Sequence, residues 1–186
     1  MSNPDELVRR ALKFATKRHK GQTRDGAIPL PYITHPVDVV NILRYEARET
    51  DPELLAAGFL HDLLEETETT DVEIDERFGG RVAQLVRELT RVEPSSEVRA
   101  TLPEPELWEL RNQLLLDGIR AMSPEAQRVK LADRVSNLRG ALATREGVAL
   151  ERYIRQSRMI LERIPRDASP ALWDWIAGAC GLEPES

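Results

Sequence analysis

Hydrophobic residues recur at helical spacing along nearly the whole chain, and this pattern constrains the possible folds more than any other feature. In the first such segment, which follows an Asn-Pro-Asp-Glu start signal at 3–6, helical spacing relates Leu7, Val8, Ala11, Leu12 and Ala15. No segment shows the alternation of apolar and polar residues that a half-buried strand requires. The pattern therefore predicts an all-α fold, a single layered helical bundle.

Start signals and apolar spacing locate the other predicted helices. One follows Thr34, and the next begins at Asp51-Pro52 and is nearly all apolar up to Leu60, so we expect it to lie centrally. Thr70 and Glu73 have the spacing of a capping box, for a short helix that ends near 78–80. Further helices are predicted for about 82–89, 107–122, 123–142 and 147–164, and for a last helix from 169.

Length and composition fit one domain. The 186 residues suffice for a substantial core, and 41% hydrophobic with 31% charged residues is ordinary for a globular protein. We expect a single domain over 1–186 with its core at about 7–165. Residues 91–105 contain three prolines and several charges without periodicity, which predicts an exposed, mobile loop.

Charge and cysteine content restrict the compartment and the partners. The single cysteine, Cys180, forms no internal disulfide, which favours a reducing cytoplasm. The N-terminus is polar and acidic without a signal segment, and no run approaches the roughly 18 apolar residues of a membrane span. A net charge of −6 argues against a general nucleic-acid binder but allows a small phosphorylated ligand held by local cations. The sequence does not indicate an oligomeric state.

The dipeptide His61-Asp62 lies in an otherwise apolar helix, where burial of both side chains is unfavourable unless something pairs them. A divalent metal would do so. Adjacent helical side chains point about 100° apart, so both would reach only an ion near an edge or end of the helix. Two further ligand types stand at plausible places, His35 before and Asp133 after. Such a mixed N/O set suits Mn²⁺, Fe²⁺, Co²⁺ or Zn²⁺ better than Mg²⁺ or Ca²⁺.

Two carboxylates follow one turn later. Glu65 shares the helical face of His61 and Asp62, and Glu66 lies four residues after Asp62. With four protein ligands, an octahedral ion would keep positions for water and a substrate oxygen. The two glutamates are therefore candidates for positioning water and moving protons.

Each of these residues also has an ordinary interpretation. A His-Asp dipeptide alone is usually structural or exposed, and His35 beside a proline is more often a cap or core residue. Asp133 could pair with Arg134 or a lysine, and the glutamates could form a solvated face. Spacing alone does not bring the separate segments together.

An ordered series of motifs favours the metal site. The series comprises His19-Lys-Gly-Gln22-Thr-Arg24, Pro31-Tyr32-Ile33-Thr34-His35-Pro36, His61-Asp62-x-x-Glu65 with Thr67, Phe78-Gly79, and Lys130-Leu131-Ala132-Asp133-Arg134-x-x-Asn137-Leu138-Arg139. Over roughly 7–142 it resembles the hydrolase domain of the RelA/SpoT alarmone enzymes, which belongs to the HD superfamily of metal-dependent phosphohydrolases. Since we expect no room for a synthetase or regulatory domain, the chain is similar to the stand-alone small alarmone hydrolases.

The resemblance implies a fold, a reaction and a cofactor. It implies an HD-superfamily helical bundle that hydrolyses ppGpp or pppGpp at the 3′ position, giving GDP or GTP and pyrophosphate. It implies that Glu65 and Glu66 order the attacking water and shuttle protons. It implies one Mn²⁺ bound by His35, His61, Asp62 and Asp133.

The resemblance also implies substrate contacts. Arg24 would stack on or pair with the nucleotide, and Asn137, on the helical face of Asp133, matches a nucleotide-contacting position. Tyr32 and Lys130 are further candidates, although Tyr32 could simply pack under the metal loop and Lys130 could simply offset the acidic cluster.

Two residues depart from the family pattern. Glu66 stands where the family usually has aspartate, and its extra methylene moves the carboxylate by over an ångström, a displacement that can cost about 100-fold in rate. Asp25 stands where the family usually has lysine, which weakens or redirects nucleotide recognition. The adenine alarmone ppApp, the 2′-phosphate of NADPH and a catalytically silent nucleotide or metal sensor therefore stay open as alternatives.

Overall fold

The computed structural model describes residues 4–24 and 29–182, and within these ranges the chain is helical without any β-strand. An isolated bridge between Thr23 and Pro31 is the extended pairing found there. The elements are α1 (Pro4–Arg18), α2 (Thr34–Asn41), the π-helix η1 (Ile42–Glu46), α3 (Pro52–Leu60), α4 (Leu63–Glu66), α5 (Asp71–Phe78), α6 (Gly80–Leu89), α7 (Ser96–Thr101), α8 (Glu104–Ala121), α9 (Pro124–Thr144), α10 (Gly147–Leu161), the 3₁₀ turn η2 (Arg166–Ala168) and α11 (Pro170–Ala179). The predicted all-α fold is confirmed.

The predicted caps explain why several helices begin where they do. The Asp51 carboxylate accepts a hydrogen bond from the backbone N–H of Glu53, and the Thr70 hydroxyl accepts one from Glu73. Glu73 does not complete the predicted capping box, because its carboxylate pairs with Arg18 instead. An ion pair between residues far apart in the sequence thus replaces the local capping hydrogen bond of the Glu73 side chain.

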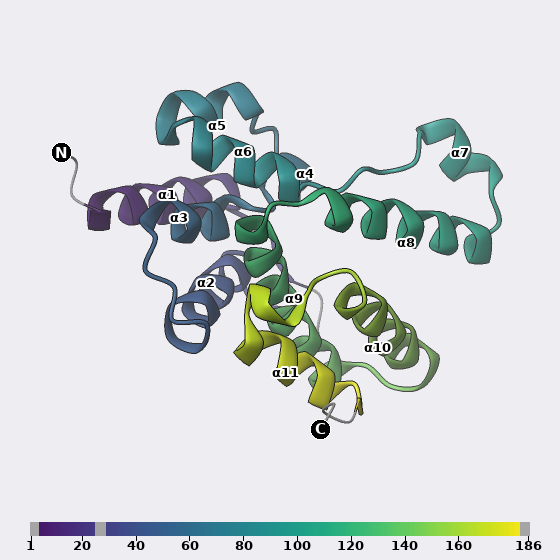
Figure 1. Ribbon diagram of the computed structural model, residues 1–186. Helices are drawn as coiled ribbons and strands as arrows, with labels where there is room; N and C mark the ends of the chain where they lie inside the picture. The colour runs from purple at the N-terminus through teal and green to yellow at the C-terminus, as the bar shows by residue number, and fades with distance from the viewer. Residues whose placement is uncertain (1–3, 25–28, 183–186) are drawn as a thin grey trace.

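Helix α3 is central, as its apolar composition predicts. Every residue from Leu54 to Leu60 is buried, and α3 contacts α1, α2, α6 and α9 (Figure 1). The second central element is α9, which contacts α2, α3, α6, α10 and α11. The end of α3 and the middle of α9 therefore meet inside the bundle.

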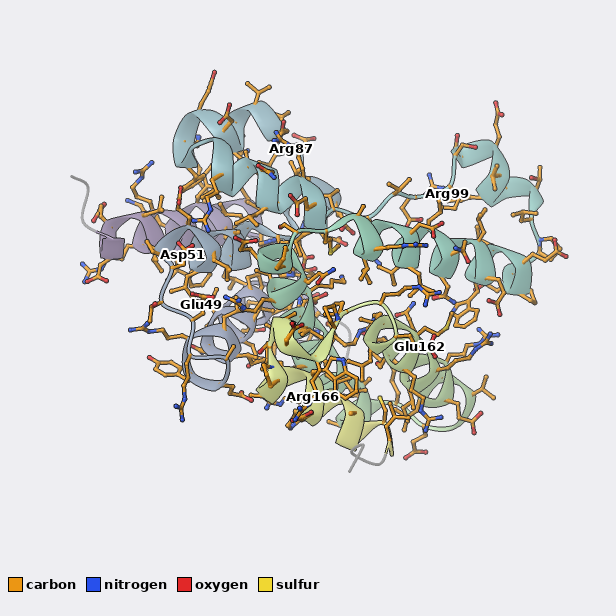
Figure 2. All side chains as sticks on the ribbon, viewed as in Figure 1. Glu49, Asp51, Arg87, Arg99, Glu162 and Arg166 are labelled. Atoms are coloured by element: carbon orange, nitrogen blue, oxygen red, sulfur yellow. The ribbon has the colours of Figure 1, made fainter. Side chains whose placement is uncertain are left out.

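The segment 91–105, predicted to be a loop, contains α7 and the first residues of α8. The Ser95 hydroxyl caps α7 by accepting from the backbone N–H of Val98, and α7 buries none of its residues. A helix of this kind leaves no hydrophobic periodicity, because none of its residues is buried. Figure 1 shows α7 on an arm that projects from the bundle together with α8, and Figure 2 shows Arg99 on this arm. Its mobility stays a prediction.

The core continues past the predicted limit of about residue 165. Helix α11 packs on α9 and α10, and its buried residues are Leu172, Ile176 and Ala177, followed by Cys180. The Ser169-Pro170 start was predicted, but a short helix at the end of a chain gives no signal of what it covers.

None of the helices described is both long and apolar enough to cross a membrane.

Candidate metal centre

The helix that carries His61-Asp62 breaks at this dipeptide. Helix α3 ends at Leu60, His61 and Asp62 form the connecting turn, and α4 begins at Leu63. Because the two residues stand at a helix end, their side chains converge, with 3.1 Å between His61 Nε2 and Asp62 Oδ1.

Two other elements complete the cluster. His35 comes from the first turn of α2 and Asp133 from the middle of α9. His35 Nε2 lies 3.5 Å from Asp62 Oδ2 and 3.3 Å from Asp133 Oδ1, and His61 Nε2 lies 3.8 Å from Asp133 Oδ1. Ligand atoms of His35, His61 and Asp62 all lie within 4.8 Å of one another. The structure thus brings together the four side chains that were predicted from separate segments.

The two imidazoles are held in the orientation that metal ligands require. His61 Nδ1 donates to the Gly58 carbonyl at 2.9 Å, so the lone pair of the neutral ring is on Nε2. This Nε2 is buried and has no hydrogen-bond partner within the described part of the chain. His35 Nδ1 lies 3.1 Å from Ser136 Oγ, which likewise directs its Nε2 into the cluster. The unpartnered Nε2 of His61 faces the carboxylates of Asp62 and Asp133. A nitrogen lone pair beside carboxylates is unfavourable unless a cation lies between them, so the donor set fits a divalent metal ion.

Gly58 permits this arrangement by letting α3 approach its neighbours closely. A Cβ atom at this position would lie 3.0 Å from Leu43 Cδ1 and 3.1 Å from Val40 Cγ2. The helix therefore places the carbonyl that orients His61 at a depth that a larger residue would disturb.

The carboxylates are oriented by hydrogen bonds as well. The Tyr32 hydroxyl donates to Asp62 Oδ2 at 2.7 Å, and Lys130 Nζ donates to Asp133 Oδ2 at 2.9 Å. Asn137 Nδ2 donates to Asp133 Oδ1. Burial by itself raises the pKa of Asp133, but the Lys130 ammonium and the contact with His35 outweigh burial and hold this pKa well below its usual range.

Tyr32 is a hydrogen-bond donor at all ordinary pH values. Burial and the neighbouring Asp62 carboxylate both raise the pKa of its phenol. Its ring stacks on His19, with 4.6 Å between the centroids. The hydrogen bond from its hydroxyl therefore fixes the position of the Asp62 carboxylate.

The two glutamates of α4 have different surroundings. The Glu65 carboxylate accepts from the backbone N–H of Arg91 at 2.8 Å and from Arg91 Nε at 2.7 Å. The carboxylate of Glu66 has no such partner among the described residues, although its backbone carbonyl accepts from Gln22 at 2.6 Å. Glu65 is therefore fixed in place, whereas the Glu66 carboxylate is not.

A cavity of about 870 Å³ opens beside the cluster, and every side chain predicted for the site lines it. These side chains are Arg24, Tyr32, His35, His61, Asp62, Glu65, Glu66, Lys130, Asp133 and Asn137. Arg24 Nη2 donates to Asn137 Oδ1 at 2.8 Å, so the two predicted nucleotide contacts form one unit. Asp25 lies outside the described residues.

The cavity is also lined by four polar residues that the sequence analysis did not select as site residues. Arg91 follows α6 in a segment that carries no motif, and Arg145, Tyr153 and Gln156 lie at or after the end of α9. Among these four residues, only Tyr153 and Gln156 carry a sequence signal, because their i, i+3 spacing places them on one face of α10.

Comparison with known proteins agrees with this geometry. The HD domain family matches residues 11–157. The chain is 39% identical over 139 residues to the guanosine-3′,5′-bis(diphosphate) 3′-pyrophosphohydrolase MESH1 of Xenopus tropicalis, covering 75% of this chain and 72% of that protein. It is 40% identical to human MESH1, covering 69% of this chain and 66% of the human protein.

A solved structure gives the same result for the fold. It belongs to a metazoan ortholog of SpoT, described as hydrolysing ppGpp with a role in starvation responses. The match has a TM-score of 0.81 and 27% sequence identity, and it covers 98% of this chain and all of the other. The chain therefore belongs to the HD domain family, in the branch that contains the MESH1 proteins.

Proposed function

We propose that the protein is a Mn²⁺-dependent 3′-pyrophosphohydrolase of ppGpp and pppGpp, which releases pyrophosphate and leaves GDP or GTP. The observation that carries the proposal is the buried cluster of His35, His61, Asp62 and Asp133 in the wall of a cavity wide enough for a nucleotide. The relatives named for this reaction in Xenopus and human support the substrate.

Manganese is the proposed ion because two imidazoles and two carboxylates form a mixed N/O ligand set. A divalent ion held there would lower the pKa of bound water and offset charge that develops on the attacked phosphorus. The residues around the ligands hold them in place: Tyr32 holds Asp62, and Lys130 with Asn137 holds Asp133.

The two glutamates divide the remaining work in this proposal. Glu65, which accepts two hydrogen bonds from Arg91, orients the attacking water with an oxygen whose position is fixed. Glu66 lines the same cavity without a partner for its carboxylate among the described residues, so its oxygens are available to accept a proton from that water.

The nucleotide would be held by side chains that adjoin the metal cluster, because Asn137 also donates to Asp133. Arg24 and Asn137 form a pair that presents a planar guanidinium to the cavity, suited to stacking on a base or pairing with a phosphate. The whole chain, 1–186, would serve as one domain of this enzyme, and the lone cysteine favours the reducing cytoplasm.

One incubation tests the proposal. Purified protein loaded with Mn²⁺ is mixed separately with ppGpp, pppGpp, ppApp and NADPH, and the products are separated by ion-exchange chromatography. We expect pyrophosphate with GDP or GTP from the guanosine alarmones. Release from ppApp alone, or loss of phosphate from NADPH alone, would reassign the substrate, and binding without any product would indicate a sensor.

A further inference from the structure

The first motif of the sequence, His19-Lys20-Gly21-Gln22, forms a turn beside the candidate site. Helix α1 ends at Arg18, and Gly21 follows with a φ of +89°, a conformation that favours glycine. The backbone N–H of Gln22 donates to the His19 carbonyl at 3.0 Å. The turn brings the two side chains together, with 2.7 Å between His19 Nδ1 and Gln22 Oε1.

The contacts of the Gln22 amide determine its orientation and the tautomer of His19. Gln22 Nε2 donates to the backbone carbonyl of Glu66 at 2.6 Å, and a carbonyl can only accept. The amide oxygen therefore faces His19 Nδ1, which must carry the proton. His19 is 3% exposed, and its Nε2 is buried without a hydrogen bond to any described residue. The imidazole thus fixes which end of the amide points at Glu66.

This amide holds the end of α4 at a residue whose carboxylate has no anchor of its own. The last carbonyls of a helix have no partner within the helix, and Gln22 supplies a donor to that of Glu66. Arg91 fixes the Glu65 carboxylate, whereas the Glu66 carboxylate has no partner among the described residues. The place of the Glu66 carboxylate in the cavity therefore depends on the backbone of a four-residue helix and on what holds that backbone.

The same turn also contacts Tyr32. The Gln22 carbonyl accepts from the backbone N–H of Tyr32 at 2.9 Å, and the Tyr32 ring stacks on the His19 ring. Because the Tyr32 hydroxyl donates to Asp62, one turn supports both a metal ligand and Glu66. The ring of His19 serves the first contact and its Nδ1–H serves the second, so substitutions can separate the two.

We propose that His19 and Gln22 are positioning residues for Glu66: the imidazole orients the Gln22 amide, and the amide holds the end of α4 so that the Glu66 carboxylate reaches the attacking water. The proposal rests on the proposed function, in which Glu66 accepts a proton from that water. Misplacing a reacting group by about 1 Å can cost about 100-fold in rate, so one hydrogen bond that fixes this backbone affects turnover.

The competing interpretation is that His19 acts only by stacking on Tyr32. His19→Phe keeps a ring and removes the N–H, whereas His19→Asn removes the ring and keeps an N–H close to the place of Nδ1. If the hydrogen bond to Gln22 matters, His19→Asn retains the function and His19→Phe loses it. If stacking alone matters, the order is reversed, and the proposal fails.

The first experiment needs no turnover. Nuclear magnetic resonance follows hydrogen exchange of the Glu66 backbone N–H, which donates to the Asp62 carbonyl at 2.9 Å, in metal-free protein. We expect exchange about 10-fold faster in Gln22→Met and His19→Phe, as the loss of one hydrogen bond predicts, and a change of less than about 2-fold in His19→Asn. The control is Gln84→Met, because Gln84 is an exposed glutamine whose amide bonds one turn along α6. Exchange in α3 checks that the fold survives, and equal rates in wild type and Gln22→Met would overturn the proposal.

The second experiment measures ppGpp hydrolysis. Gln22→Met and His19→Phe should lower kcat by about 10-fold or more, with little change in KM or Mn²⁺ affinity. In a Glu66→Ala background, Gln22→Met should change kcat by less than about 2-fold, because its effect passes through Glu66. A loss that persists in that background would contradict the proposal. If the wild type cleaves no ppGpp, the proposed function fails, while the exchange rates still decide whether His19 and Gln22 hold the end of α4.

Discussion

Replacing Tyr32 with phenylalanine should weaken metal binding while leaving the fold intact. The substitution removes one hydroxyl, which donates to Asp62 Oδ2 at 2.7 Å, and keeps the ring that stacks on His19. A hydrogen bond to a charged group contributes about 1.5–3 kcal/mol, and a contact that orients a metal ligand affects metal affinity by roughly 10- to 100-fold. Both estimates give about the same expected loss in Mn²⁺ affinity, roughly 10- to 100-fold.

The measurement is a Mn²⁺ titration of metal-stripped protein, followed by the electron paramagnetic resonance signal of free Mn²⁺. The control is Tyr45→Phe, because Tyr45 is 76% exposed and is not one of the residues described in the metal cluster. Thermal unfolding of the metal-free proteins checks that the fold survives. A Tyr32→Phe variant with the Mn²⁺ affinity of the wild type would refute the reasoning that hydrogen bonds to the metal ligands hold these ligands in place.

Three further predictions address stability and turnover. The Glu49 carboxylate accepts hydrogen bonds from the N–H groups of Thr50 and Asp51 and pairs with Arg128. Burial raises the pKa of Glu49, but these partners lower it by more, so the net pKa is below the ordinary carboxyl value. The resulting stabilisation is present above the ordinary carboxyl pKa and is lost as the pH falls through the lowered pKa. Figure 2 shows Glu49 and Asp51 together on the connection before α3, and Glu49→Gln should lower the free energy of unfolding by about 1–3 kcal/mol at pH 7, a difference that urea titrations should find shrinking in acid. Gly58→Val should cost about 1–3 kcal/mol in the same assay, since its side chain would overlap neighbours that are already 3.0 Å from a Cβ; an unchanged midpoint would contradict the close packing. Glu66→Asp should change kcat more than Mn²⁺ affinity, and unchanged steady-state kinetics would make Glu66 a bystander.

Much of the fold could be predicted because its signals are local. The apolar run before Leu60 identifies the central helix, and Asp51 and Thr70 act as the caps that their positions suggest. Helix α7 was not predicted, because none of its residues is buried and its start is marked only by the Ser95 cap within a segment rich in prolines. Periodicity reports burial, and a helix without burial leaves none.

The candidate site divides in the same way. His61 and Asp62 are adjacent in sequence, so their meeting at a helix end followed from the helix geometry. Arg91 could not be found, because its contact with Glu65 joins residues that are 26 positions apart and depends on how α6 packs. Arg134 lies within a recognised motif, but the burial of its Nε and Nη1 without a hydrogen bond to any described residue appears only once its surroundings are known.

The most direct test of the central claim is product analysis with Mn²⁺-loaded wild-type protein and its Asp62→Ala variant, each incubated with ppGpp. The account predicts GDP and pyrophosphate in equal amounts from the wild type and neither from the variant, with the helical circular dichroism of both proteins unchanged. Equal turnover by the Asp62→Ala variant, or products other than GDP and pyrophosphate from the wild type, would contradict it.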